Sequence, residues 1–364
     1  MGVINLCNEQ DSLNQLAYYR NEASIPFGGS YRLIDFSLSN MINSGIQDIA
    51  IFTSSNYRSL MDHLGNGGDW DLDRKNGGLF ILPPSYQNSS ITCKGDILNF
   101  DNHLDFFNRG KSKYILISGG NLISNIDYRP ALKFHKDMNA DITILHKKLT
   151  RNDLVSKWYK ITTNQDNRIL SIKNNNPKCN KISLETYIIE KKLLLTLIKT
   201  IKKNYKNDFL HDGIINNLDT LNVYGYLVDD YVAKIDSVKS YYKNSMNLLN
   251  EDILDNLFNK SRVIHTKTNS EPPVKYLDKS EVVNSLIANG CVIEGKVENS
   301  ILFKGVKVHK EAYIKNSVLM QNCDIGDNSV IINSILDKDV KVSSWKIIKG
   351  EEKLPLILPK KLII

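Results

Sequence analysis

A four-residue pattern in the last quarter of the chain constrains the fold more than any other feature. Asn-Ser followed by two apolar residues occurs four times, at residues 284–287, 299–302, 316–319 and 333–336. Successive copies begin 15, 17 and 17 residues apart, which is close to three six-residue units. A period of this length predicts one coil of a parallel β-helix, in which the aliphatic side chains of each coil stack on those of the next. The strands of an irregular β-sandwich are the alternative.

The first 150 residues alternate between apolar, strand-like runs and helical stretches. This alternation predicts a mostly parallel sheet. The expected strands are 3–6, 49–53, 114–118 and 141–146, and the expected helices are 37–44, 58–64, 99–107 and 130–138. Further along, the pattern predicts a hairpin at residues 159–172, a strand at 184–189 and a helix at 191–203.

Length and composition predict two domains and a cytoplasmic location. With 364 residues, we expect a first domain over 1–250, a linker over 251–279 and a repeat domain over 280–364. No apolar run approaches the roughly 20 residues that span a bilayer. The five cysteines have no paired spacing, which is typical of reduced thiols: Cys7, Cys93, Cys179, Cys291 and Cys323. The net charge of +7 comes with dispersed lysines, so we expect a solvated surface and no nucleic-acid partner.

No glycine occurs between Gly2 and Gly28. A fold that holds a phosphate at the end of its first strand needs glycines there, because only a backbone without Cβ atoms lets successive N–H groups approach the phosphate oxygens. The turn at residues 7–12 instead reads Cys-Asn-Glu-Gln-Asp-Ser. It contains no basic residue, and its two carboxylates would repel a triphosphate.

Three long motifs occur beyond this turn. Residues 26–46 read PFGGSYRLIDFSLSNMINSGI, residues 70–84 begin WDLDRKNGG and end ILPP, and residues 235–246 read IDSVKSYYKNSM. In this order they resemble the signatures of bacterial glucose-1-phosphate adenylyltransferases, and the resemblance covers nearly the whole chain. It implies an α/β fold, with a Rossmann-like, GT-A-like nucleotidyltransferase domain that has a mostly parallel mixed sheet. A left-handed parallel β-helix of hexapeptide type, which serves regulation and assembly, would follow.

The resemblance also implies that the catalytic positions have been lost. Transfer of a nucleotidyl group from ATP to glucose 1-phosphate needs basic groups for the phosphates and paired aspartates for Mg²⁺. Glu22 stands where the family has a lysine, and Asn121 and Tyr231 stand where it has the two metal-binding aspartates. The family's glycine-rich phosphate loop aligns with residues 7–13 and is absent. We therefore expect no catalytic residue, and no metal or cofactor bound by this chain.

Other positions are interpreted as remnants of a degenerate substrate pocket. The resemblance places Gly28, Gly29, Gly95 and Ser183 there, with Asn174 near the position of a sugar-phosphate lysine. Three carboxylates could form another metal site, although surface or structural roles are favoured: Asp127, Asp229 and Asp230.

Two retained arginines match effector-binding positions of the family. Arg20 and Arg32 would bind the phosphates of a sugar-phosphate or nucleotide effector near the β-helix. The alternatives are an ion pair of Arg32 with Asp35 and a solvated loop position for Arg20. His309 is the one histidine of the repeat region, and an ordinary surface role is favoured over that of a β-helix acyltransferase.

These losses are similar to those of the non-catalytic partner subunit of the family. We therefore expect a regulatory, catalytically impaired subunit of glucose-1-phosphate adenylyltransferase in a hetero-tetramer with a homologous catalytic subunit. Mg²⁺ would be bound by that partner, and the effector would be a phosphorylated small molecule or nucleotide. No membrane partner is expected. A weakly active adenylyltransferase and a ligand-sensing homo-oligomer are the alternatives.

Overall fold

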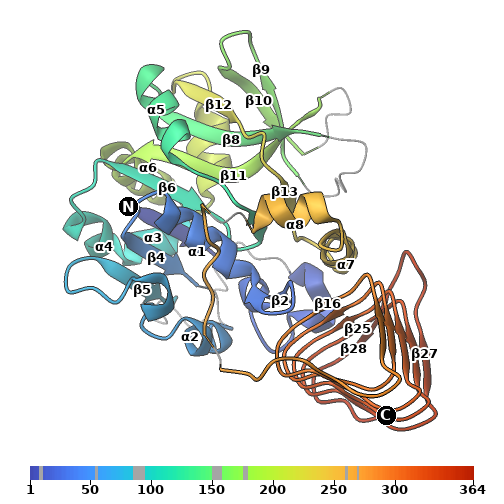
Figure 1. The fold of residues 1–364 in the computed structure, drawn as a ribbon. Coiled ribbons are helices and arrows are strands. Elements are labelled where there is room, and N and C mark those ends of the chain that lie inside the picture. The colour runs from blue at the N-terminus through green and yellow to red at the C-terminus, as the bar shows by residue number, and fades with distance from the viewer. Residues whose placement is uncertain are drawn as a thin grey trace. The chain divides into compact units, whose positions relative to one another are not determined.

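The computed structural model describes residues 1–7, 11–53, 56–84, 95–149, 158–174, 179–258, 261–268 and 270–364 (Figure 1). The chain divides into two compact units. We call the first the sheet unit; it consists of Met1–Gln10, Ile34–Lys234 and Asn259–His265. We call the second the repeat unit; it consists of Asp11–Leu33, Ile235–Phe258 and Thr266–Ile364. Two segments of the expected first domain, 11–33 and 235–250, therefore cluster with the repeats, together with the start of the expected linker.

The sheet unit is built on a mixed nine-stranded sheet. Its strands are β1 (Gly2–Asn5), β4 (Asp48–Phe52), β5 (Gly78–Leu82), β6 (Tyr114–Ser118), β8 (Ile142–Lys148), β9 (Lys160–Thr163), β10 (Ile169–Lys173), β11 (Lys181–Glu190) and β12 (Val223–Leu227). Strands β5, β4, β1 and β6 are parallel neighbours, β11 runs antiparallel between β6 and β8, and β12 is parallel to β8. The expected parallel sheet and the β9–β10 hairpin are confirmed.

The described residues of this part of the chain include the helices α1 (Leu33–Asn43), α2 (Arg58–Leu64), α3 (Ile97–Asn102), α4 (Leu104–Arg109), α5 (Arg129–Asp137) and α6 (Lys191–Lys203). The helix predicted over 99–107 is two short helices, because His103 between them has non-helical backbone angles. None of the helices in the described ranges is long and apolar enough to cross a bilayer.

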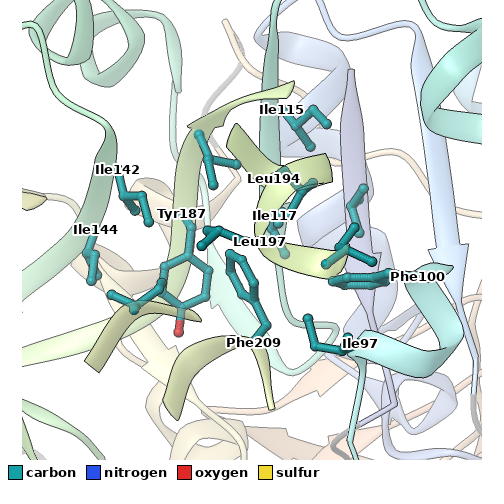
Figure 2. Packing of buried hydrophobic residues seen from close by; sticks show 14 of the residues in the cluster. Ile97, Phe100, Ile115, Ile117, Ile142, Ile144, Tyr187, Leu194, Leu197 and Phe209 are labelled. Carbon is teal, nitrogen blue, oxygen red and sulfur yellow. The ribbon is translucent and has the colours of Figure 1, made fainter. Parts of the chain in front are cut away.

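Helix α6 is placed by its apolar face. Leu194, Leu197, Ile198 and Ile201 recur at helical spacing and are buried in one cluster with residues of the sheet and of α3. Figure 2 shows Leu194 and Leu197 among Ile117, Phe100, Tyr187 and other members of this cluster. Burial of each such side chain stabilises the fold by about 1.5–3 kcal/mol.

The repeat unit contains three five-stranded parallel sheets that form the coils of a left-handed β-helix. The first sheet contains β14 (Lys275–Tyr276), β17 (Val292–Ile293), β20 (Lys307–Val308), β23 (Asp324–Ile325) and β26 (Lys341–Val342). The second contains β15 (Glu281–Val283), β18 (Lys296–Glu298), β21 (Tyr313–Lys315), β24 (Val330–Ile332) and β27 (Ile347–Lys349). The third contains β16 (Leu286–Ile287), β19 (Ile301–Leu302), β22 (Val318–Leu319), β25 (Ser334–Leu336) and β28 (Leu356–Leu358).

The repeated Asn-Ser pair forms the corner between the second and third sheets. The four asparagines have φ between 42° and 49°, a left-handed conformation that asparagine tolerates better than most residues: Asn284, Asn299, Asn316 and Asn333. The serine hydroxyls connect the coils, since Ser300 Oγ accepts from the N–H of Ser317, and Ser317 Oγ from that of Ser334. The β-helix interpretation is therefore confirmed and the β-sandwich alternative is wrong.

The expected linker contributes structure at both of its ends. Helix α8 (Glu251–Leu257) occupies its start, with the Asn250 side chain capping the N-terminus. Near its end, the N–H of Gly290 donates to the carbonyl of Pro272, so the first coil already includes residue 272. Helix α7 (Val238–Asn247) precedes α8 and begins with a capping box of Ser237 and Ser240.

Candidate functional site

The end of β1 in the sheet unit is occupied by a buried hydrogen-bond network. The side chain of Asn5 donates to the Asp96 carboxylate at 2.8 Å, and the N–H of Phe209 donates to its other oxygen at 2.8 Å. Asp96 is 3% exposed. Burial raises the pKa of its carboxyl to about 6, although the hydrogen bond from Phe209 opposes the shift. Residues 8–10 of the lost phosphate loop lie outside the described residues.

The turn that contains Gly95 is bound to Asn207. The N–H groups of Asp96 and Ile97 donate to the Asn207 carbonyl, and the N–H of Leu98 donates to its side-chain oxygen at 2.7 Å. Gly95 has φ of +128°, and a Cβ there would come within 2.3 Å of the Asn207 carbonyl oxygen. Gly95 is therefore required by the approach of Asn207, and the three successive amides already have protein acceptors.

The two positions expected for metal-binding aspartates flank a two-stranded ribbon. Its strands are β7 (Leu122–Ser124) and β13 (Val232–Lys234), and their antiparallel register pairs Leu122 with Lys234. Asn121 precedes β7 and Tyr231 precedes β13, so they lie at opposite ends of the ribbon. Within the described ranges, no three acidic, histidine or cysteine residues are grouped so that they could hold a metal ion.

Two of the three other candidate carboxylates have basic partners. Asp127 forms a bidentate pair with the guanidinium of Arg129, whose hydrogen bonds lower the pKa of the Asp127 carboxyl. Asp230 lies 3.7 Å from the Arg262 guanidinium. These contacts support the structural role favoured for both carboxylates.

Asn40 holds the ribbon against α1. Its side-chain amide donates to the carbonyl and hydroxyl of Ser124, both at 3.1 Å, and its oxygen accepts from the N–H of Ile126 at 3.2 Å. Asn40 lies inside the motif at residues 26–46. This motif therefore has a scaffolding role that does not depend on catalysis.

Ser183 lies next to an ion pair at a bulge of β11. Its hydroxyl accepts from the N–H of Glu185, whose φ of +50° is unusual for a non-glycine residue. The Glu185 carboxylate pairs with the ammonium of Lys234, which also lies 6.0 Å from the ring centroid of Trp158. This part of the expected pocket thus contains a charged pair. Asn174 is exposed after β10, and the residues that follow it are outside the described ranges.

Glu22, Gly28 and Gly29 belong to the repeat unit. Glu22 is 4% exposed in a 3₁₀ turn. The two glycines connect β2 (Pro26–Phe27) to β3 (Tyr31–Arg32) with φ of +61° and +80°. A Cβ on Gly29 would come within 2.9 Å of Leu286, so local packing also requires glycine there.

Arg20 forms a buried ion pair with a residue that the sequence analysis missed. Its guanidinium donates to both oxygens of Asp337 at 2.7 and 2.6 Å, and both side chains are nearly fully buried. The alternative of a solvated loop position for Arg20 is therefore wrong. Asp35, the alternative partner of Arg32, forms a buried pair with His63 at 2.6 Å.

Positive charge accumulates around this ion pair. Burial lowers the pKa of Lys338 to about 7, and the neighbouring charges of Arg32 and Arg20 lower it further, as does Lys360 more weakly. Asp337 is the carboxylate that opposes this shift. We call Arg20, Arg32, Lys338 and Lys360 the cation cluster. Two of its members, Arg20 and Arg32, were predicted from the sequence.

The repeat itself carried a signal for Asp337. The residue after each Asn-Ser pattern is buried, and it is apolar in the first three copies: Ala288, Phe303 and Met320. The fourth copy has Asp337 there, fully buried. An acidic residue at a core position of a repeat indicates a buried cationic partner, because an unpaired buried charge is costly.

His309 has a surface role, as favoured. It is 46% exposed, and its Nε2 lies 2.7 Å from the Asp324 carboxylate on the next coil.

The two units define a nucleotidyltransferase fold joined to a hexapeptide-repeat β-helix. The family model described as "Nucleotidyl transferase" matches residues 12–251, and that described as "GlmU-like, C-terminal hexapeptide" matches residues 272–353. The glycogen biosynthesis protein GlgD of Bacillus subtilis is 40% identical over all of this chain and 96% of its own length. GlgD of Geobacillus stearothermophilus is 40% identical over 86% of this chain and 82% of its own length.

A glucose-1-phosphate adenylyltransferase of Clostridium novyi is 34% identical over 80% of this chain and 78% of its own length. The chain belongs to the nucleotidyl transferase family that includes these GlgD proteins and glucose-1-phosphate adenylyltransferases.

Proposed function

We propose that this chain is a regulatory, catalytically impaired subunit that modulates a homologous glucose-1-phosphate adenylyltransferase in glycogen biosynthesis. The observation that carries the proposal is the turn after Gly95, whose three successive N–H groups are bonded to Asn207. A nucleotide bound at this turn, which the family resemblance implies to be a nucleotide-binding one, would need such N–H groups. It would also be repelled by the buried Asp96 carboxylate, which is ionised above about pH 6.

The residues at the metal positions support the same conclusion. Asn121 and Tyr231 carry no formal charge, and Glu22 places a carboxylate where the family has a lysine. Phosphoryl-transfer chemistry depends almost entirely on positioning and on neutralising charge on the transferring group. We therefore expect turnover at least about 10³-fold below that of a catalytic homologue.

Regulation in this proposal uses the cation cluster. Burial lowers the pKa of Lys338, the charges of Arg32, Arg20 and Lys360 lower it further, and Asp337 offsets only part of this shift. A phosphorylated small molecule would relieve the repulsion and would favour the conformation in which the cluster is closed around it. A coupling of about 1–3 kcal/mol to the partner subunit is the usual range for such regulation. The partner would bind Mg²⁺ and supply the chemistry.

The test measures ADP-glucose formation from ATP and glucose 1-phosphate by this chain alone, by the catalytic homologue alone and by the two co-purified. We expect no significant turnover by this chain, and a mixed assembly whose substrate affinity or effector response differs about 5- to 150-fold from that of the homologue alone. Turnover by this chain comparable with that of the homologue would contradict the proposal and favour the weakly active enzyme. Absence of any mixed assembly would favour the homo-oligomer.

A further inference from the structure

A polar groove in the repeat unit lies at a different corner of the β-helix from the cation cluster. It has a volume of about 580 Å³, within the range of small-molecule sites. It is lined by helix α7 and the chain directly after it, by the asparagine corner, and by residues 352 and 353. We call the asparagine corner its floor and the other two segments its walls. The cation cluster contains Lys338, which follows the third sheet, whereas the groove floor lies between the second and third sheets.

The floor offers a hydrogen-bond donor and an acceptor side by side. Asn284 donates to the side-chain oxygen of Asn299 at 2.8 Å, and Asn316 donates to that of Asn333 at 3.1 Å. No such bond joins Asn299 to Asn316 among the described residues. Asn299 and Asn316 both line the groove from adjacent coils, and these two bonds leave the amide N–H₂ of Asn299 and the amide oxygen of Asn316 unused. A hydroxyl group, which both donates and accepts, complements such a pair.

The walls add positive charge. Lys239 on α7 and Lys353 both line the groove, and no ion pair with a carboxylate is found for either of them among the described residues. Lys243 adds a third ammonium, one helical turn after Lys239, and Glu352 contributes a carboxylate. The lining thus has a net positive charge, which suits a ligand that carries an anionic group.

The groove has no surface on which a nucleobase could stack. Tyr242 is the aromatic residue of the lining, and it is only 9% exposed. Its hydroxyl donates to the Asn316 carbonyl at 2.6 Å, which fixes the ring between α7 and the floor. Stacking on an exposed aromatic face is the usual means of holding a base, so the groove favours a ligand without one.

We propose that this groove is a second anion site that binds a phosphorylated sugar, with the phosphate at Lys239 and Lys353 and sugar hydroxyls on Asn299 and Asn316. This assignment does not depend on the proposed regulatory function, because the groove shares no residue with the cation cluster.

The test uses the full chain carrying Arg32→Gln, which weakens binding at the cation cluster. Isothermal calorimetry compares four probes: glucose 6-phosphate, glucose, inorganic phosphate and AMP. We expect saturable binding of glucose 6-phosphate, at least about 10-fold tighter than that of the other three. Glucose lacks the phosphate, inorganic phosphate lacks the sugar hydroxyls, and AMP carries a base for which the lining offers no stacking surface. Bound glucose 6-phosphate should also protect Lys239 and Lys353 from acetylation, as measured by mass spectrometry.

Matched variants locate the site. Replacing Lys239 and Lys353 with glutamine should weaken binding at least about 10-fold. Replacing the exposed Lys192 and Lys199 on α6 removes the same charge and should leave binding unchanged. The proposal is overturned if glucose 6-phosphate does not bind, if both double variants bind it equally, or if inorganic phosphate binds as tightly as the sugar phosphate.

Discussion

Replacing Asp337 with asparagine should destabilise the repeat unit and expose Arg20 to anions. The carboxylate accepts two hydrogen bonds from the buried Arg20 guanidinium, at 2.7 and 2.6 Å. Removing one partner of a buried pair typically costs about 3–5 kcal/mol, because the remaining charge stays buried without compensation. Asparagine keeps one acceptor oxygen, so we expect a loss of about 3 kcal/mol, or roughly 6–12 °C in Tm at 2–4 °C per kcal/mol.

Differential scanning calorimetry with and without inorganic phosphate measures this prediction. Because Arg20 and Lys338 lose their neighbouring carboxylate, phosphate should raise the Tm of the Asp337→Asn variant more than that of the unmodified protein. Asp327→Asn is the matched control, since Asp327 is exposed on the same β-helix, and it should change stability by less than about 0.5 kcal/mol. A loss below about 1 kcal/mol for Asp337→Asn, or no difference in the phosphate effect, would refute the reasoning.

Three further predictions concern pH and backbone packing. Since the folded-state pKa of Asp96 is raised to about 6, its contribution to stability is present below about pH 4 and is lost as the pH rises through 6. Urea unfolding at several pH values should show the free energy of unfolding falling over this range, and Asp96→Asn should not show that fall. The folded-state pKa of Lys338 is lowered to about 7, so its contribution is present above about pH 10.5 and is lost as the pH falls through 7. A phosphorylated ligand should raise the pKa of Lys338, so its binding near pH 8 should be accompanied by proton uptake. The binding heat measured by calorimetry should then depend on the buffer, and this dependence should disappear in Lys338→Met. Gly95→Ala should lower the free energy of unfolding by at least about 2 kcal/mol, because the added Cβ would approach the Asn207 carbonyl oxygen to 2.3 Å. Gly45→Ala, whose Cβ would meet no atom within 4 Å, should lower it less. Equal losses would count against the packing argument.

Periodicity predicted the parallel sheet and the β-helix, whereas the left hand of the β-helix and the nucleotidyltransferase fold were implied by the family resemblance. The Asn-Ser pattern predicted the β-helix because each copy performs the same two tasks in every coil, a left-handed turn at asparagine and a hydroxyl bond to the next coil. The helix 191–203 and the strand 114–118 were predicted with their observed ends, since both have long apolar patterns and clear boundaries.

Non-local pairing was beyond sequence reasoning. Strand β13 has three residues, and its pairing with β7, more than 100 residues earlier in the chain, leaves no local pattern. The hydrogen bonds that the turn after Gly95 donates to Asn207 likewise join residues about 110 positions apart. The missing glycines predict a lost phosphate loop, whereas the protein partner of the neighbouring turn is seen only in the structure. The pairing of Arg20 with Asp337 spans 317 positions, although the odd acidic residue in the fourth repeat could have indicated it.

The most direct test of the central claim uses a mixed assembly in which the catalytic homologue carries an inactivating substitution at one of its own metal-binding aspartates. Any remaining ADP-glucose formation must then come from this chain. We predict that turnover falls to that of the inactivated homologue alone, while the assembly still forms and still responds to phosphorylated ligands in a binding assay. Persistent turnover that depends on the presence of this chain would show that its site is catalytic and would contradict the account.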